Sequence, residues 1–226
     1  MPGVKVLLID LDAQRNATGV MLKKTGYPSQ ETIFDIFSGN KLTSSHIHET
    51  DINNLFMIPA SLQLVEVESM LANDLDGFFK LKDNLEMAQN EFDYIIIDCP
   101  PSLSVNTINA LVFANHLIIP MQVSKFSIDG IQGILDAVRS VKKRYNPSLN
   151  ILGALLAFHD PRTTLAQAML PEIEKLMPVF KVKIPKSVAV EESHLLKKDL
   201  FDYAPKSKVT LAYKKFVEEV TGKNNL

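Results

Sequence analysis

Acidic side chains directly follow two of the most apolar runs in this sequence: Asp10 and Asp12 follow Val6–Ile9, and Asp98 follows Ile95–Ile97. If both runs are parallel strands, their carboxyl ends meet at one edge of a sheet, where α/β proteins place their chemistry. Three carboxylates at that edge repel one another unless a cation or a positioned water uses them, as in a magnesium–nucleotide site. Each aspartate alone also fits a turn or a helix cap, and only the two motifs together favour the functional interpretation.

The elements that would position these groups alternate between short apolar runs and longer amphipathic stretches. Nearly continuous apolar runs are typical of strands covered on both faces, and they predict strands over Val4–Ile9, Leu55–Ile58, Tyr94–Ile97, Leu117–Met121, Ile151–Ala157 and Val179–Ile184. A helical period predicts helices over Ser104–Ala114, Ser127–Tyr145 and Leu165–Leu176, and around the stripe of Ala212, Phe216 and Val220. Strand–helix alternation implies right-handed crossovers. We therefore expect an α/β fold with a mostly parallel sheet and helices on both faces, in one domain over residues 1–226.

Composition restricts the class of protein. The chain has 24 Lys and Arg residues against 26 Asp and Glu residues, which leaves room for a local basic patch but excludes a chain that is basic throughout. The single cysteine, Cys99, cannot form an internal disulfide or a multi-cysteine metal site. No apolar run approaches the roughly 20 residues of a membrane span. We expect a cytoplasmic protein that does not partner with a membrane.

Lysines concentrate near the C-terminus, where nine of the 24 basic residues lie between positions 181 and 215. One interpretation is a solvated helix face, since Glu218 and Glu219 offset part of the charge. The other is binding of duplex DNA through its phosphates, without sequence preference. Few aromatic residues lie among these lysines, which argues against stacking on single strands.

Motifs along the whole chain resemble those of the ParA/Soj-type partition ATPases, a deviant-Walker branch of the P-loop NTPases. The segment Ile9–Thr18 is similar to the family's LLIDxDPQxNAT, and Asp98–Ser102 with Asn109–Leu111 is similar to its D-x-PPSL…NAL region. The resemblance continues in order through Ile119–Gln122, Asp160–Thr163, Ile184–Lys186 and Tyr203–Lys208. It implies a P-loop NTPase-like fold of the SIMIBI type. It also implies a role in chromosome or plasmid partition through an ATP-dependent homodimer that binds duplex DNA nonspecifically, with a ParB-type centromere-binding partner.

The resemblance also implies roles for the three strand-end aspartates. Asp12 would position and polarise the water that attacks ATP, because phosphoryl transfer depends mostly on positioning and electrostatics. Asp98 would hold a water bound to Mg²⁺, and Asp10 would support that shell of water. The competing explanation for Asp10 is a hydrogen-bonded strand terminus.

Further roles fall on the second half of the chain. By the same resemblance, Asp160, Arg162 and Pro185 would lie near the base of the nucleotide, although ordinary loop chemistry also explains these three residues. The protein would be associated with the nucleoid. Its DNA-binding residues would be Lys186, Lys206, Lys208, Lys214 and Lys215.

Other branches of the deviant-Walker group require features that this sequence lacks. A MinD-like membrane positioner would end in a basic amphipathic helix, whereas the last predicted helix carries mixed charge. An amidotransferase of the cobyrinic-acid type would need an added glutaminase domain, for which 226 residues leave no room. These differences favour the partition branch.

One family motif is missing. ParA-like proteins carry a strand, a P-loop of the form K-G-G-V-G-K-T-T and a helix ahead of the segment that opens this chain, but none of the nine glycines here lies in G-x-x-x-x-G-K-[ST]. That loop binds the phosphates and Mg²⁺ through backbone N–H groups, a lysine and a threonine. We therefore expect this sequence to bind and hydrolyse ATP poorly, and its neighbouring strands to have unpaired edges. It would be a fragment, a gene model begun at an internal start, or a degenerate module that binds DNA or a partner without turnover.

Overall fold

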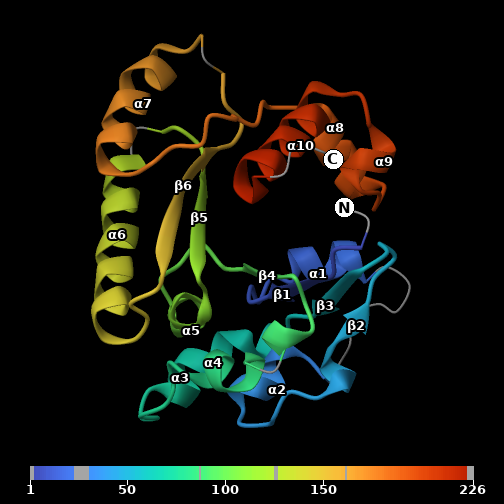
Figure 1. The fold of residues 1–226 in the computed structure, drawn as a ribbon, viewed down its shortest axis with the longest axis vertical. Coiled ribbons are helices and arrows are strands. Elements are labelled where there is room, and N and C mark those ends of the chain that lie inside the picture. Colours follow the sequence, from blue (N-terminus) through green and yellow to red (C-terminus); the bar gives the residue numbers. More distant parts are fainter. Residues whose placement is uncertain (1–2, 23–30, 87, 125–126, 161, 223–226) are drawn as a thin grey trace. The chain divides into compact units, whose positions relative to one another are not determined.

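The structure, a computed structural model, describes residues 3–22, 31–86, 88–124, 127–160 and 162–222. The chain divides into two compact units. Unit 1 comprises Met1–Ala114 and Lys143–Pro147, and unit 2 comprises Asn115–Lys142 and Ser148–Leu226. Figure 1 labels the helices and strands of both. The single domain expected over residues 1–226 stays a prediction.

Unit 1 contains a four-stranded sheet in the order β2-β3-β1-β4. Strand β1 (Val6–Asp10) pairs in parallel with β3 (Leu55–Ile58) and with β4 (Tyr94–Asp98), whereas the two-residue β2 (His48–Glu49) pairs antiparallel with β3. Since β1 is central, alternate side chains such as those of Leu7 and Ile9 are fully buried. Strand β4 forms an edge of this sheet.

The helices of unit 1 are short. They are α1 (Asn16–Met21), α2 (Ile33–Phe37), α3 (Val67–Leu71), α4 (Lys80–Leu85) and α5 (Val105–Phe113), with 3-10 turns at Ser44–His46, Leu62–Glu66 and Ala88–Asn90. The buried amide of Asn109 on α5 accepts a hydrogen bond from the Leu81 N–H at 3.3 Å and donates one to the Gly77 carbonyl at 2.8 Å. This asparagine therefore fixes α5 against the start of α4.

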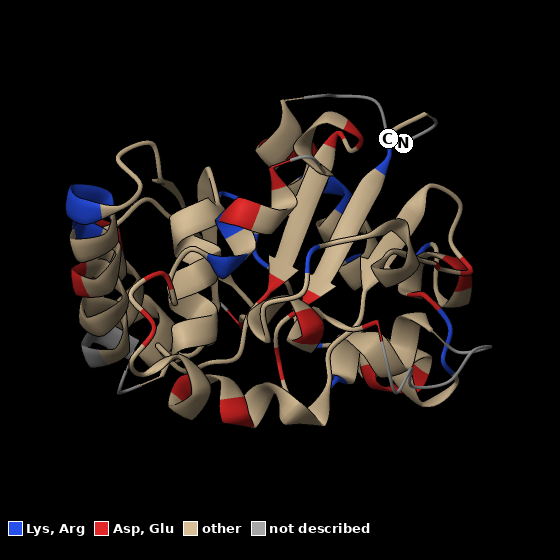
Figure 2. Ribbon diagram, turned by 90° about the horizontal axis from the view of Figure 1, so that it is seen from below, with Lys and Arg blue, Asp and Glu red and all other residues tan. Residues whose placement is uncertain are grey.

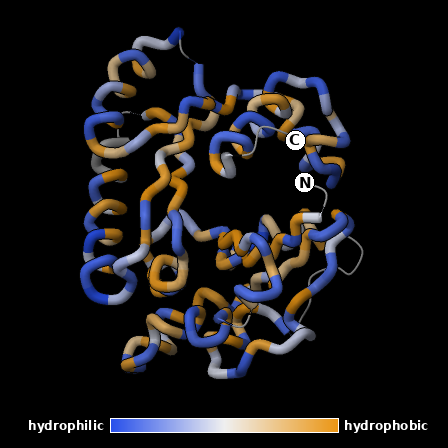
Figure 3. The backbone as a smooth tube through the Cα atoms, viewed as in Figure 1, coloured by the Kyte–Doolittle hydropathy of each residue, from blue (hydrophilic) through white to orange (hydrophobic). Residues whose placement is uncertain are grey.

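Unit 2 is built around two parallel strands, β5 (His116–Met121) and β6 (Asn150–Leu156). Helix α6 (Ser127–Arg144) and helix α7 (Thr164–Leu176) pack their apolar faces with these strands. Figure 3 shows apolar residues along both strands and at regular intervals along α6, as the sequence period predicts. The shared core contains Ile119, Ile131, Leu135, Ala154 and Ile173.

The remaining helices of unit 2 are α8 (Val188–Leu195), α9 (Leu200–Tyr203) and α10 (Lys208–Thr221). Helix α10 begins where the Ser207 side chain accepts a hydrogen bond from the Thr210 N–H at 3.2 Å, and it ends at Gly222, whose φ of 66° suits glycine. Its predicted stripe of Ala212, Phe216 and Val220 packs in a core with Phe180.

The predicted strand Val179–Ile184 is wrong. Only Val179 bridges to Ala154 of β6, and the ladder resumes at Ile184, whose N–H donates to the Leu156 carbonyl at 2.8 Å. Between these points the N–H groups of Lys181 and Val182 donate to the carboxylate of Glu219 on α10, at 2.7 and 3.0 Å. A helix side chain has therefore replaced the sheet as the partner of Lys181 and Val182, while Phe180 and Ile184 still donate to carbonyl groups of β6.

Apart from that segment, the predicted elements are confirmed within one or two residues at each end. The mostly parallel α/β fold class is confirmed as well. The elements that the sequence did not predict are short ones, namely β2, α1 to α4 and α8 and α9. Helices of four to eight residues show too little period to be recognised.

Candidate functional site

Asp10 and Asp98 lie side by side at the ends of β1 and β4, where they are paired in the parallel register. The N–H of Leu11 donates to the carbonyl of Asp98 at 2.8 Å, which extends the pairing beyond the strand end. Figure 2 shows acidic residues, in red, where neighbouring strands end. The predicted meeting of strand-end carboxylates is therefore present in unit 1.

Asp10 is fully buried, and both of its carboxylate oxygens are occupied. Its Oδ2 accepts hydrogen bonds from the Thr18 N–H at 2.9 Å and the Thr18 hydroxyl at 2.7 Å, and its Oδ1 accepts one from the Asp12 N–H at 3.0 Å. The Thr18 hydroxyl in turn accepts a hydrogen bond from the Ala60 N–H at 3.0 Å. Asp10 thus holds the turn that carries Asp12, the helix α1 and the loop after β3 together. These contacts agree with the hydrogen-bonded strand terminus considered from the sequence.

Asp12 lies half-buried in the turn between β1 and α1. Its Oδ1 accepts a hydrogen bond from the Gln14 N–H at 2.9 Å, and its carbonyl accepts one from the Arg15 N–H at 2.9 Å. Arg15 has a φ of 58°, the left-handed conformation that lets the chain enter α1. No described residue hydrogen-bonds Oδ2 of Asp12. The turn therefore fixes one oxygen and leaves the other available to a water.

Asp98 is exposed, and its carboxylate makes no hydrogen bond or ion pair with the described residues. Partial desolvation at the strand end, and then the negative charges of Asp10 and Asp12, raise the pKa of Asp98 above its ordinary value. Mg²⁺ prefers oxygen ligands and keeps several waters, so a free carboxylate with two others nearby fits a water-mediated Mg²⁺ site. Within the described ranges, no cluster of three or more His, Cys, Asp or Glu side chains could bind a metal directly.

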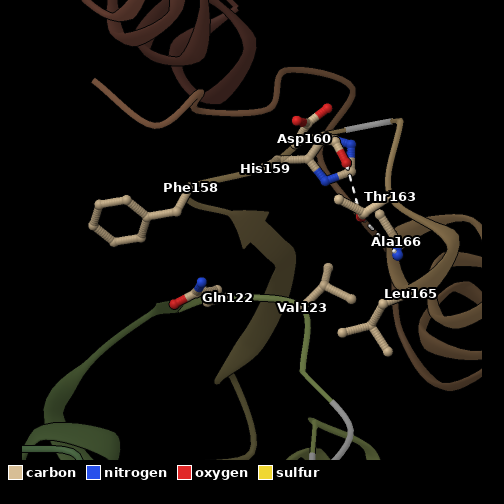
Figure 4. A pocket seen from close by; sticks show the side chains of 8 residues that line it. All are labelled: Gln122, Val123, Phe158, His159, Asp160, Thr163, Leu165 and Ala166. Atoms are coloured by element: carbon tan, nitrogen blue, oxygen red, sulfur yellow. Dashed lines mark hydrogen bonds between the residues drawn. The ribbon is translucent and has the colours of Figure 1, made fainter. Parts of the chain in front are cut away.

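In unit 2, the predicted base-binding residue Asp160 lines a pocket of about 280 Å³ that follows the ends of β5 and β6, whereas Arg162 and Pro185 do not line it (Figure 4). Asp160 accepts hydrogen bonds from the Arg162 guanidinium at 2.9 and 2.8 Å and from the Arg162 N–H at 3.0 Å. These bonds hold the pKa of Asp160 at about 2. The pocket is lined by Gln122, Val123, Phe158, His159, Asp160, Thr163, Leu165 and Ala166.

His159 was isolated in the sequence, but the structure places it in this pocket, where its ring and that of Phe158 point in different directions (Figure 4). Its N–H donates to the Ile184 carbonyl at 3.0 Å, which connects the pocket to the segment carrying Pro185. The Nδ1 atom of His159 is buried without a hydrogen-bond partner in the described part of the chain. Burial, and then the charge of Lys183, lower the pKa of His159, so the ring is neutral at pH 7.

Two of the five lysines expected to bind DNA line a groove of unit 2, and the other three do not. Lys208 and Lys215 line a groove of about 490 Å³ on one face of α10. Lys214 instead lies with its Nζ 6.0 Å from the centre of the Phe201 ring. Lys206 and Lys186 are exposed but do not line the groove. Lys181 and Lys183, which belong to the nine C-terminal basic residues but not to the five named by the resemblance, also line this groove.

The comparisons with known proteins agree with the two strand-end motifs. The family model described as an AAA domain matches residues 1–151. The sporulation initiation inhibitor protein Soj of Bacillus subtilis is 36% identical over 221 residues, covering 96% of this chain and 87% of Soj. The chromosome-partitioning ATPase Soj of Treponema pallidum is 31% identical over 226 residues, covering 99% of this chain and 88% of that relative.

A solved structure gives the same fold. Cobyrinic acid a,c-diamide synthase from Mycobacterium smegmatis, with a bound ATP analogue and magnesium, superimposes with a TM-score of 0.79 at 29% identity. The match covers 98% of this chain and 85% of that one. Among the residues described for this chain, no helix is both long enough and apolar enough to cross a membrane.

Proposed function

Since this chain belongs to the ParA/Soj-type family of partition ATPases, we propose that it acts in the partition of chromosomal or plasmid DNA. The observation that carries the proposal is the register pairing of Asp10 with Asp98, with Asp12 in the turn that follows. In this proposal the protein works in the cytoplasm on the nucleoid, as an ATP-dependent homodimer with a ParB-type partner.

Each of the three aspartates would have a different role in ATP hydrolysis. Asp12 would orient the attacking water through its unengaged Oδ2, since the hydrogen bonds to Gln14 and Arg15 keep the turn in place. Asp98 would hold a Mg²⁺-bound water. Asp10 would act mainly by positioning Asp12, because its own oxygens are occupied. Mg²⁺, when bound, would offset the charge of the triphosphate.

The nucleotide base would lie near the pocket of unit 2. Asp160 and Arg162 fix each other beside it, and the His159 N–H ties its loop to the residue before Pro185. His159 lines this pocket and would contribute to its wall. The bound ATP analogue and magnesium of the Mycobacterium smegmatis structure support a nucleotide as the ligand.

Tight binding of ATP by this chain is not expected. Its sequence contains no glycine-rich phosphate loop, so the triphosphate would face three carboxylates with little positive charge beside Mg²⁺. Titration calorimetry of the chain with Mg-ATP should therefore show no micromolar affinity. Micromolar binding would mean that other residues form the phosphate site.

Turnover is tested on a chain that carries, ahead of Met1, the K-G-G-V-G-K-T-T segment of the family with its flanking strand and helix. We expect Asp12→Asn to lower phosphate release about 100-fold or more while nucleotide binding survives. Asp93→Asn is the matched control, because Asp93 is an exposed aspartate of the same unit whose carboxylate accepts, among the described residues, a hydrogen bond from the Lys5 N–H alone. Equal rates for the two variants would reject the role of Asp12.

Duplex DNA would be bound through phosphates by the predicted lysines Lys186, Lys206, Lys208, Lys214 and Lys215. Lys206 and Lys208 flank the Ser207 cap of α10, where the N–H groups of the helix can share a phosphate. Replacing both by Glu should flatten the log–log salt dependence of DNA binding by about 0.9 for each phosphate that is no longer neutralised. Lys142→Glu with Lys143→Glu on α6 makes the same change of charge as a control. Unchanged DNA retention in the first variant would indicate a solvated face.

A second candidate is a module that binds DNA or a partner without hydrolysis, since none of the nine glycines of the given sequence lies in a phosphate loop. The same assays separate the two functions. If the chain with the added loop binds DNA but releases no phosphate, the non-hydrolysing module is the correct function.

A further inference from the structure

The groove on α10 combines positive charge with an apolar floor. One wall carries Lys181 and Lys183, and the other carries Lys208 and Lys215, which lie two helical turns apart on α10. Between the walls lie Val182, Leu211 and Ala212. Leu211 is 47% exposed, so this floor is open to a ligand.

Among the described residues, the four ammonium groups have no carboxylate at ion-pair distance. Lys181, Lys208 and Lys215 make no ion pair there, and the Nζ of Lys183 donates to the Phe180 carbonyl. The acidic group facing this segment from α10, Glu219, is already engaged by the N–H groups of Lys181 and Val182. Burial lowers the pKa of Lys183, and the charges of Glu174 on α7 and Glu219 on α10 oppose this shift without cancelling it, so the poorly hydrated ammonium would gain from a further anion. The groove is thus preformed for negative charge.

We propose that this groove binds an acidic, amphipathic segment of a partner protein, whose carboxylates meet the four lysines while an apolar side chain covers Leu211. The apolar floor distinguishes this ligand from the DNA proposed above. A phosphate backbone satisfies the lysines but brings no apolar side chain to Val182 and Leu211. Charge complementarity at the rim with an apolar anchor in the centre is the usual arrangement of a specific protein interface. Because Lys208 and Lys215 also belong to the proposed DNA surface, the acidic segment would compete with DNA for them.

The test measures binding of fluorescent peptides to the chain as it exists, without nucleotide. One probe is a glutamate-rich peptide with two leucines one helical turn apart, and the other is the same peptide with serine in place of leucine. We expect the leucine peptide to bind about tenfold more tightly, since it buries an apolar side chain. Leu211→Ser should abolish this difference. Lys181→Gln with Lys183→Gln should weaken both peptides about fivefold.

Leu196→Ser is the matched control, because Leu196 is an exposed leucine of the same unit, 53% exposed and outside the groove. It should leave the advantage of the leucine peptide unchanged, and circular dichroism should show that all variants are folded. Equal binding of the two peptides would overturn the proposal. Displacement of the leucine peptide by inorganic phosphate at equal charge would also overturn it. The same holds if short duplex DNA binds more tightly than the leucine peptide and this binding is lost in the Lys181→Gln, Lys183→Gln variant. Because no turnover is measured, failure here leaves the ATPase proposal untouched.

Discussion

Thr18→Val should destabilise the protein far more than an ordinary loss of a hydroxyl group. The Thr18 side chain is fully buried, donates to Asp10 Oδ2 at 2.7 Å and accepts from the Ala60 N–H at 3.0 Å. Valine keeps the shape but removes a hydrogen bond to a charged group, worth about 1.5–3 kcal/mol, and leaves a buried N–H unpaired, at about 1–3 kcal/mol. We expect a loss of about 2.5–6 kcal/mol in the free energy of unfolding. This loss is a large part of the free energy of unfolding of a typical domain, which is roughly 5–15 kcal/mol.

Urea denaturation followed by circular dichroism measures this loss. Thr107→Val is the control, since the Thr107 hydroxyl donates to the Ser102 carbonyl at 2.7 Å on the surface of the same unit. Water replaces that bond, so its removal should cost about 0.5 kcal/mol. If Thr18→Val costs no more than Thr107→Val, Asp10 does not depend on Thr18. Asp10 would then be free for a role other than holding the turn of Asp12.

Three further predictions follow from single positions. Asp98→Asn should stabilise the chain by about 0.5 kcal/mol near pH 7, because desolvation and two neighbouring carboxylates raise the pKa of Asp98 and so disfavour its charged form. Thermal unfolding should show this gain vanishing as the pH falls through that raised pKa, and a gain that grows in acid would reverse the argument. Ile96→Lys should reduce self-association in sedimentation velocity, because Ile96 is 54% exposed on the edge strand β4. Unchanged association would show that the β4 edge does not mediate self-association. Gly153→Ala should cost about 1–3 kcal/mol, since a Cβ there would lie 3.0 Å from the Pro178 carbonyl oxygen at a φ of 153°, whereas Gly130→Ala, in open space on a helix, should cost nothing measurable.

The long elements of the fold could be predicted from the sequence because their apolar pattern is decided locally. The apolar runs of β1, β4 and β6 and the helical period of α6 and α10 each carry their own signal. The segment Val179–Ile184 has an equally apolar pattern, but its backbone conformation depends on Glu219, which lies 37 residues or more away in the chain. Such a tertiary hydrogen bond leaves no trace in the local pattern.

The candidate site also contains features that could be predicted from the sequence and features that required the structure. The neighbourhood of Asp10 and Asp98 follows from the parallel register, so strand-end carboxylates were predictable. Thr18 was not, because its partners Asp10 and Ala60 lie 8 and 42 residues away. The grouping of the lysines also required the structure: Lys181 faces Lys208 only because the segment after α7 packs against α10. Whether each named residue acts as proposed stays a prediction.

Phosphate release with and without nonspecific duplex DNA tests the central claim most directly, in the chain that carries the added phosphate loop. A partition ATPase that works on DNA should hydrolyse ATP slowly alone and several-fold faster with DNA, and Lys206→Glu with Lys208→Glu should remove the stimulation but keep the basal rate. A chain that binds Mg-ATP with Asp12 intact, yet releases phosphate at the same rate with and without DNA, would contradict the account.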